Sequence, residues 1–269
     1  MLFQVAAHIK FLLKSTNQHG VHSPFVFDLV TKCFYDKTDY PEYQVLKSYR
    51  EQFSHNHEII EITDFGAGSR VMNSNKRVIS KMAKIAGITP KRAELLYRLV
   101  NYFQPYVVLE LGTLLGLSTS ALHLGNSNAS IISLEGCKNT LAVTKEHFQT
   151  TFSKDVFEHV SFINTEFDSF LEEADLSFLT ERKEDYSLVY FDGNHSKEAT
   201  LRYLVKLLPT ITEKTIWVFD DIHWSKDMEG AWDYIKELPE VTVTIDTFEW
   251  GLVFFRKEQA KQHFTIRVN

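Results

Sequence analysis

The sequence has few cysteines, no run of basic residues and no long apolar run, and each scarcity excludes a class of protein. Its two cysteines, Cys33 and Cys137, are far apart and provide neither a disulfide framework nor a metal-binding spacing. This usage favours a reducing cytoplasm as the compartment. Because 35 acidic residues outnumber 29 basic ones, we expect no general affinity for nucleic acid.

The N-terminal stretch MLFQVAAHIKFLLK is apolar only in part, since Gln4, His8 and Lys10 interrupt it. No small-residue cleavage site follows, so the stretch predicts an amphipathic helix and not a signal peptide. No segment reaches the roughly 18 consecutive apolar residues that a membrane span needs. We therefore expect no membrane partner.

What the sequence does have is a large apolar fraction, 44% of its 269 residues, which suffices for one large α/β domain with or without an extension. Up to about residue 105 the signals are mainly helical. Ser23–Pro24 and Thr89–Pro90 each place an N-cap residue before a proline, which is typical of a helix start. We predict a helical N-terminal extension or lid over residues 1–88 and a main domain over residues 89–269.

Beyond residue 105, strand patterns alternate with helical ones. Strands separated by helices predict a parallel sheet with right-handed crossovers. The tail VTVTIDTFEWGLVFFRK predicts an antiparallel hairpin at the sheet edge. The expected fold is α/β: a Rossmann-like, doubly wound sheet, mostly parallel with an antiparallel C-terminal strand. Its five parallel strands are predicted at residues 107–111, 130–135, 160–164, 187–191 and 215–220.

The first of these strands leads into a turn with two glycines, within VVLELGTLLGLSTSAL, and three ligands compete for it. A phosphate-binding loop requires a lysine where Leu117 stands. A dinucleotide turn requires a glycine where Thr113 stands, since the backbone must approach a pyrophosphate. S-adenosylmethionine has no phosphate, and an acid such as Glu110 suits its positive charge. A carboxylate after the second strand, Glu135, suits its ribose hydroxyls.

Three aspartates follow the fourth and fifth strands, in YFDGNHS and VFDDIHW. Asp192, Asp220 and Asp221 are expected at one edge of the sheet, where a divalent cation would neutralise them. Alternatively, they cap the helices that follow. His195 and His223 lie beside them as candidate general bases, or as ligands of a softer metal.

These motifs, LELGTLLGLSTSAL, ISLEGC, YFDGNHS and VFDDIHW, resemble in their order the class I S-adenosylmethionine-dependent methyltransferases. The branch that they resemble is that of the catechol and caffeoyl-CoA O-methyltransferases, over roughly residues 90–256, whereas residues 1–88 resemble an extension in uncharacterised bacterial relatives. The resemblance implies Mg²⁺ or another divalent cation at Asp192, Asp220 and Asp221, although those enzymes usually carry Asn where Asp221 stands. The cofactor-binding residues that it implies are Glu110, Gly112, Thr113, Gly116, Ser118, Glu135, Gly136, Glu166, Phe167 and Asp192.

The resulting hypothesis is O-methylation of a small molecule, with catalytic roles for Asp192, His195 and His223. A non-catalytic binding module with this fold and, less favoured, an NAD-dependent oxidoreductase remain the alternatives. The resemblance also allows a homodimer. A second glycine-rich stretch, ITDFGAGSR at residues 62–70, imitates a cofactor turn, but no strand–helix–strand pattern follows it, so we interpret it as a loop.

Overall fold

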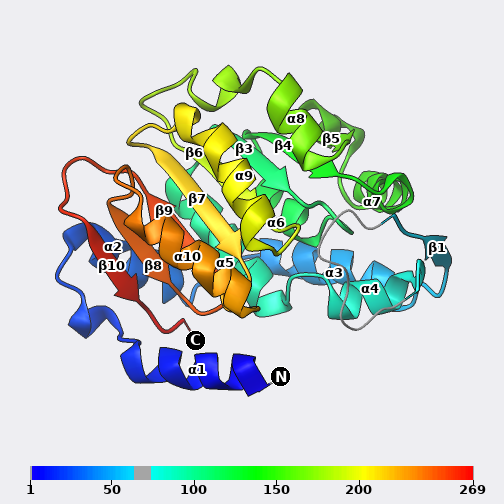
Figure 1. The fold of residues 1–269 in the computed structure, drawn as a ribbon. Helices are drawn as coiled ribbons and strands as arrows, with labels where there is room; N and C mark the ends of the chain where they lie inside the picture. The colour runs from blue at the N-terminus through cyan, green and yellow to red at the C-terminus, as the bar shows by residue number, and fades with distance from the viewer. Residues whose placement is uncertain (1, 64–73, 269) are drawn as a thin grey trace. The chain divides into compact units, whose positions relative to one another are not determined.

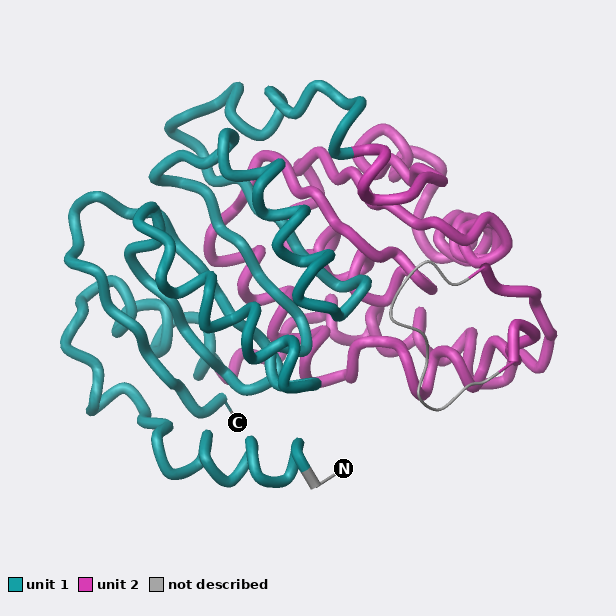
Figure 2. The backbone as a smooth tube through the Cα atoms, in the orientation of Figure 1, with its two compact units in different colours: residues 1–36, 171–269 teal, residues 37–170 magenta. Residues whose placement is uncertain are grey.

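The computed structural model describes residues 2–63 and 74–268, which form two compact units (Figure 2). Unit 1 combines residues 1–36 with residues 171–269, and unit 2 is the continuous stretch 37–170. Residues 37–88 group with the segment that follows them, so the units divide the chain differently from the predicted boundary at residue 88. That boundary stays a prediction. Most of the glycine-rich stretch at residues 62–70 lies outside the described residues.

Unit 2 contains a parallel sheet of three strands in the order β3-β4-β5. Every residue of β3 is buried, as expected for a strand that is covered on both faces. A short antiparallel pair, β1 and β2, lies before it in the sequence. The elements are α3 (Glu42–Ser54), β1 (Ile59–Glu61), β2 (Lys76–Val78), α4 (Ile79–Ile85), α5 (Pro90–Phe103), β3 (Val107–Leu111), α6 (Leu117–Gly125), β4 (Ser130–Glu135), α7 (Lys138–Thr151), η3 (Lys154–Glu158), β5 (Val160–Asn164) and α8 (Phe167–Glu173), whose last turn belongs to unit 1.

Unit 1 contains strands in the order β10-β8-β9-β7-β6. The β6–β7 and β8–β10 pairs are parallel, and β9 runs antiparallel to both β7 and β8. The elements (Figure 1) are α1 (Leu2–Lys14), η1 (Gln18–Gly20), α2 (Pro24–Leu29), the π-helix η2 (Val30–Phe34), η4 (Leu176–Leu179), β6 (Ser187–Phe191), α9 (Lys197–Leu207), η5 (Leu208–Thr210), β7 (Thr215–Asp220), α10 (Lys226–Glu237), β8 (Val243–Asp246), β9 (Trp250–Phe254) and β10 (Gln262–Thr265).

The predicted fold class is confirmed, because parallel strands alternate with helices and the C-terminal hairpin is antiparallel. All five predicted parallel strands begin and end where the sequence placed them. The hairpin of β8 and β9 also forms, but its expected place at the sheet edge is wrong. Strand β9 lies between β7 and β8, and β10 covers the outer side of β8. The residues of β10 are half-buried or exposed and largely polar, so they carry no strand pattern.

The predicted N-terminal helix is confirmed as α1, which lies near the C-terminal end of the chain in unit 1 (Figure 1). Only a narrow face of α1 is buried. Ala7 and Phe11 are buried, whereas Val5 and Ile9 are more than half exposed. After the helix, Thr16 forms a parallel bridge with the segment beyond β10. Over residues 2–63 and 74–268, every helix is too short or too polar to cross a membrane.

Substitution of two glycines in unit 1, one on β9 and one on α10, tests how these two elements pack. A Cβ at Gly251 would lie 2.5–2.8 Å from the ring of the buried Trp232, so Gly251→Ala should lower the free energy of unfolding by about 1–3 kcal/mol. At Gly230, inside α10, the nearest atom is the flexible Lys197 Nζ at 3.4 Å. Gly230→Ala should therefore raise stability by up to about 1 kcal/mol. Urea unfolding measures the free energy of unfolding of both variants. Equal changes in the two variants would contradict this packing.

Candidate active site

The turn between β3 and α6 adopts backbone angles that few residues take. Gly112, Leu114 and Gly116 have positive φ values of 117°, 47° and 68°. At the first and last of these positions glycine avoids the strain that a Cβ would cause. The N–H groups of Gly112 and Thr113 both donate to the carbonyl of Leu134, at 3.1 Å. These bonds hold the turn against the end of β4.

Side chains from α3 and α7 pack on the same turn. A Cβ at Gly116 would lie 2.8 Å from Thr144 Cγ2 and 2.9 Å from the Tyr49 hydroxyl oxygen. Tyr49 donates to the Leu115 carbonyl at 2.9 Å, and Thr144 donates to the Leu114 carbonyl at 2.6 Å. Sequence reasoning missed both hydroxyls, because one polar side chain on an amphipathic helix does not indicate which backbone it will reach.

The acid at the end of β3 is enclosed. Glu110 is fully buried, and its Oε2 accepts hydrogen bonds of 2.5 Å from the hydroxyls of Thr119 and Ser133. Burial raises the pKa of Glu110 from 4.5 to about 7, and the hydroxyls of Ser118, Ser133 and Thr119 offset part of that rise. The Thr113 hydroxyl joins this network, 2.5 Å from that of Ser133. In this arrangement Glu110 holds the turn together, since direct contact with a ligand would need an exposed carboxylate.

The acid at the end of β4 is half-buried and holds two backbone groups. Glu135 accepts the N–H of Leu114 on Oε2, at 2.9 Å, and the N–H of Cys137 on Oε1, at 2.8 Å. The Asn164 side-chain amide, at the end of β5, donates to the carbonyls of both Glu135 and Gly136. The first turn and the ends of β4 and β5 are thus connected through these side chains.

Two further residues that the resemblance implies for cofactor binding follow β5 directly. Glu166 is exposed and Phe167, the first residue of α8, is half-buried. Unit 2 therefore contains every residue predicted to bind the cofactor except Asp192, which belongs to unit 1. Whether these residues bind S-adenosylmethionine stays a prediction.

Unit 1 brings three of the predicted polar side chains together. His195 Nε2 lies 3.9 Å from Asp192 Oδ1 and 4.0 Å from Asp221 Oδ2, and the three side chains are 20–27% exposed. Asp220, by contrast, is buried, and its Oδ1 accepts the N–H of Asp221 at 2.8 Å. The imidazole and two carboxylates thus form a partly exposed cluster at the ends of β6 and β7.

The alternative in which these aspartates cap the next helices is wrong. Ser196 caps α9 and Ser225 caps α10, each through its side-chain oxygen. The loops that lead to the two caps each contain a residue with a positive φ, Asn194 at 49° and Asp221 at 55°. Backbone strain of this kind is found most often at functional sites.

His223 is in a different environment from His195. Its Nδ1 lies 2.9 Å from Glu229 Oε1, and its Nε2 lies 2.9 Å from Asp246 Oδ2. Burial lowers the pKa of His223, but the hydrogen bonds and charges of Asp246 and Glu229 outweigh burial and raise it above its ordinary value. An imidazole that donates from both nitrogens has no lone pair for a substrate proton, so this geometry does not favour the predicted role of His223 as a general base.

Within residues 2–63 and 74–268, no group of three or more His, Cys, Asp or Glu side chains has an arrangement that would hold a metal ion. Asp192 and Asp221 supply the oxygen ligands that hard divalent cations prefer, but Asp220 is buried and its Oδ1 already accepts the N–H of Asp221. The residues as placed do not fit the predicted cation site, and binding of a divalent cation stays a prediction.

The comparisons with known proteins agree with this fold. Residues 109–222 match the model of a family described as "Methyltransferase domain". This stretch runs from β3 to the end of β7 and contains both glycines of the first turn, Glu135 and the aspartates. No curated protein matches the sequence. The resemblance to methyltransferases is therefore confirmed for this part of the chain.

Solved structures share this α/β fold over more of the chain. The SAH-bound methyltransferase PaMTH1 from Podospora anserina is 14% identical, with a TM-score of 0.58, and the match covers 88% of this chain and 97% of that one. A putative caffeoyl-CoA O-methyltransferase from Staphylococcus aureus is 11% identical, with a TM-score of 0.53 and coverage of 66% and 88%. Cofactor-bound Rv0187 from MTB is 15% identical, with a TM-score of 0.52 and coverage of 86% and 95%.

Enclosure of Glu110 predicts a specific pH dependence of stability. Folding raises the pKa of Glu110 from 4.5 to about 7. The contribution of Glu110 to the free energy of unfolding is therefore fully present below pH 4.5 and is lost as the pH rises towards 7. Glu110→Gln removes this contribution, so the variant should gain stability relative to the native protein between about pH 5 and about pH 7.5. Urea unfolding across that range measures the difference. The exposed Glu158→Gln is the control, and a parallel pH profile for Glu110→Gln and the native protein would contradict the enclosure.

Proposed function

We propose that the protein is an S-adenosylmethionine-dependent methyltransferase that methylates an oxygen of a small molecule. The observation that carries the proposal is the arrangement around Glu135, whose carboxylate lies beside the strained turn after β3. The match of residues 109–222 to a methyltransferase domain supports it, as does the likeness to a structure described as an SAH-bound methyltransferase.

The residues of unit 2 fit the proposed donor. Glu135 Oε2 accepts the N–H of Leu114 and Oε1 accepts the N–H of Cys137, and a carboxylate oxygen accepts more than one hydrogen bond, so this type of side chain suits ribose hydroxyls. Thr113 stands where a pyrophosphate would require a glycine, which disfavours a dinucleotide and is compatible with a donor that has no phosphate. When bound, S-adenosylmethionine supplies a methyl group on a positively charged sulfur.

The residues of unit 1 supply a candidate base for the acceptor. A hydroxyl must lose its proton when it is methylated, and an imidazole near neutral pH is suited to accept that proton. His195 lies 3.9 Å and 4.0 Å from the carboxylates of Asp192 and Asp221, which would orient the ring and stabilise it once protonated. We assign the base to His195 and not to His223.

A divalent cation at Asp192, Asp220 and Asp221 is the alternative way to activate a hydroxyl, since a metal lowers the pKa of an oxygen bound to it. The described geometry does not fit that cation, so we assign no step to it. The two routes differ in their response to a chelator.

Donor binding is tested at Glu135. Glu135→Ala should weaken binding of S-adenosylhomocysteine more than tenfold, because the ribose loses its acceptors and Leu114 loses the partner of its N–H. Isothermal titration calorimetry measures the affinity, and the exposed Glu158→Ala in the same unit is the matched control. Unchanged affinity in Glu135→Ala would show that the ribose is bound elsewhere and would remove the main support for the proposal.

Catalysis is tested at His195. His195→Ala should lower kcat by about 10²–10⁴-fold, the usual contribution of a general base, while the affinity for S-adenosylhomocysteine stays within twofold. The exposed His263→Ala is the control. Activity that disappears with EDTA and returns with Mg²⁺, while His195→Ala remains active, would assign the step to the cation. Binding of the donor without turnover of any acceptor would indicate a non-catalytic member of the fold.

A further inference from the structure

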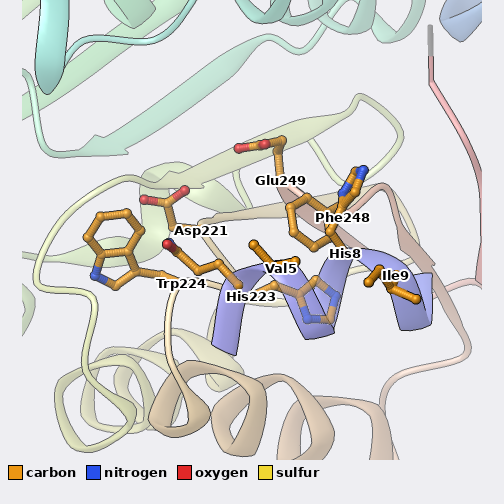
Figure 3. Close-up of a pocket in the computed structure, with 9 residues that line it drawn as sticks. Val5, His8, Ile9, Asp221, His223, Trp224, Phe248 and Glu249 are labelled. Carbon is orange, nitrogen blue, oxygen red and sulfur yellow. The ribbon is translucent and has the colours of Figure 1, made fainter. Parts of the chain in front are cut away.

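Each unit contains a cavity, and the two cavities differ in their relation to the candidate site. The cavity in unit 1, of about 430 Å³, is lined in part by Asp221 and His223 (Figure 3), so it belongs to the region already described. The cavity in unit 2, of about 270 Å³, is lined by residues to which the proposed chemistry assigns no role. Its walls come from α3, from α5 and from Leu117, the first residue of α6. This second cavity indicates a further ligand.

The buried residues that line the unit 2 cavity are apolar: Leu46, Ala93 and Leu117. Tyr43 also lines it, and its ring packs edge-on against the ring of Tyr97, with centroids 5.5 Å apart. Two packed helices and a supported ring make the walls of a preformed site. Its volume lies at the lower end of the range for small-molecule sites, so the cavity suits a ligand of the size of an amino acid.

Arg50, on α3, provides the unit 2 cavity with a cation that has few hydrogen-bond partners. Its side chain is half-buried, and Nη1 donates to the Ala83 carbonyl at 3.2 Å. Nη2 is buried and has no partner in the described part of the chain. Burial also lowers the pKa of Arg50, because the charge has lost some of its water. A guanidinium has five N–H donors, so a carboxylate from a ligand would supply acceptors that this side chain lacks.

Two acids line the same cavity, Asp39 just before α3 and Glu94 on α5. Neither side chain forms a hydrogen bond or an ion pair with a residue that the structure describes, so neither acid neutralises Arg50 directly. Lys47, the other cation of the lining, is largely exposed and lies 4.0 Å from Glu51, so it has a partner of its own. Opposite charges that share a cavity without pairing favour a ligand that carries both signs.

We propose that the unit 2 cavity binds a free amino acid with an apolar side chain. The carboxylate of the ligand accepts hydrogen bonds from Arg50, and its ammonium group lies towards Glu94 and Asp39. The side chain of the ligand packs on Leu46 and Leu117. A molecule with a single charge would leave the wall of the other sign without a partner. The proposal goes beyond methyl transfer, because it uses none of the residues assigned to the donor or to the base.

Leucine and two molecules that each lack one of its charged groups test the need for both charges. 4-Methylpentanoate has the carboxylate alone, and 3-methylbutylamine has the ammonium group alone. Titration calorimetry without donor should show leucine binding at least about fivefold more tightly than either of them. Equal affinities, tighter binding of a singly charged molecule, or no heat with leucine at millimolar concentration would overturn the proposal.

Two variants locate the binding. Glu94→Gln should weaken leucine about fivefold without weakening 4-methylpentanoate, whereas Glu158→Gln, an exposed acid elsewhere in unit 2, should change neither. Arg50→Gln should weaken leucine about tenfold without weakening 3-methylbutylamine. Arg50 also holds the Ala83 carbonyl, so circular dichroism checks the fold of that variant, and Glu94→Gln decides the matter if the fold is lost. Unchanged affinity for leucine in Glu94→Gln would place the ligand elsewhere and overturn the proposal.

The amino-acid tail of the proposed donor is the other source of the same chemistry. If the sites are independent, saturation with S-adenosylhomocysteine should change the affinity for leucine by less than about twofold, and Glu94→Gln should leave the affinity for S-adenosylhomocysteine within the same limit. Competition between the two ligands would make the cavity part of the donor site and would overturn this proposal. A protein that binds leucine but not S-adenosylhomocysteine would contradict the proposed function alone and support this one.

Discussion

The structure of unit 2 depends on one fully buried carboxylate, that of Glu110. An ionised carboxylate costs several kcal/mol to bury, so it must be protonated or receive hydrogen bonds. Glu110 receives them from Thr119 on α6 and Ser133 on β4. Because its own backbone belongs to β3, one side chain connects two strands and the helix between them. The glycine turn lies between the same strand and helix, and the Thr113 hydroxyl, 2.5 Å from that of Ser133, links the turn to this network.

Backbone strain in the described residues is concentrated in the loops that follow strands. Five residues other than glycine have a positive φ: Gln104, Leu114, Asn194, Asp221 and Phe248. Gln104 is accounted for as the left-handed residue that ends α5. The other four lie after β3, β6, β7 and β8, and three of them, Leu114, Asn194 and Asp221, are on the turns of the candidate site. Strain that is costly for stability is kept there because it fixes the direction of nearby side chains.

Sequence patterns predicted the strands well because burial alone determines them. Val107–Leu111 and Thr215–Asp220 are buried throughout, and continuous apolar runs mark such strands. The edge strand β10 could not be predicted, since Gln262–Thr265 is mostly polar and forms through backbone pairing with β8. The contributions of Tyr49 and Thr144 to the turn were equally hidden, because they depend on contacts between residues far apart in the chain.

Sequence motifs alone could not distinguish the two histidines after β6 and β7, His195 and His223. Each follows an aspartate by two or three positions, so the sequence offers them as equivalent candidates. Their environments differ because the residues that surround them come from elsewhere in the chain. Asp246, at the end of β8, and Glu229, on α10, hold both nitrogens of His223, and Phe248 stacks on its ring. These contacts join His223 to two other elements of unit 1, whereas His195 lies 3.9 Å from the carboxylate of Asp192 and 4.0 Å from that of Asp221, where the loops after β6 and β7 meet.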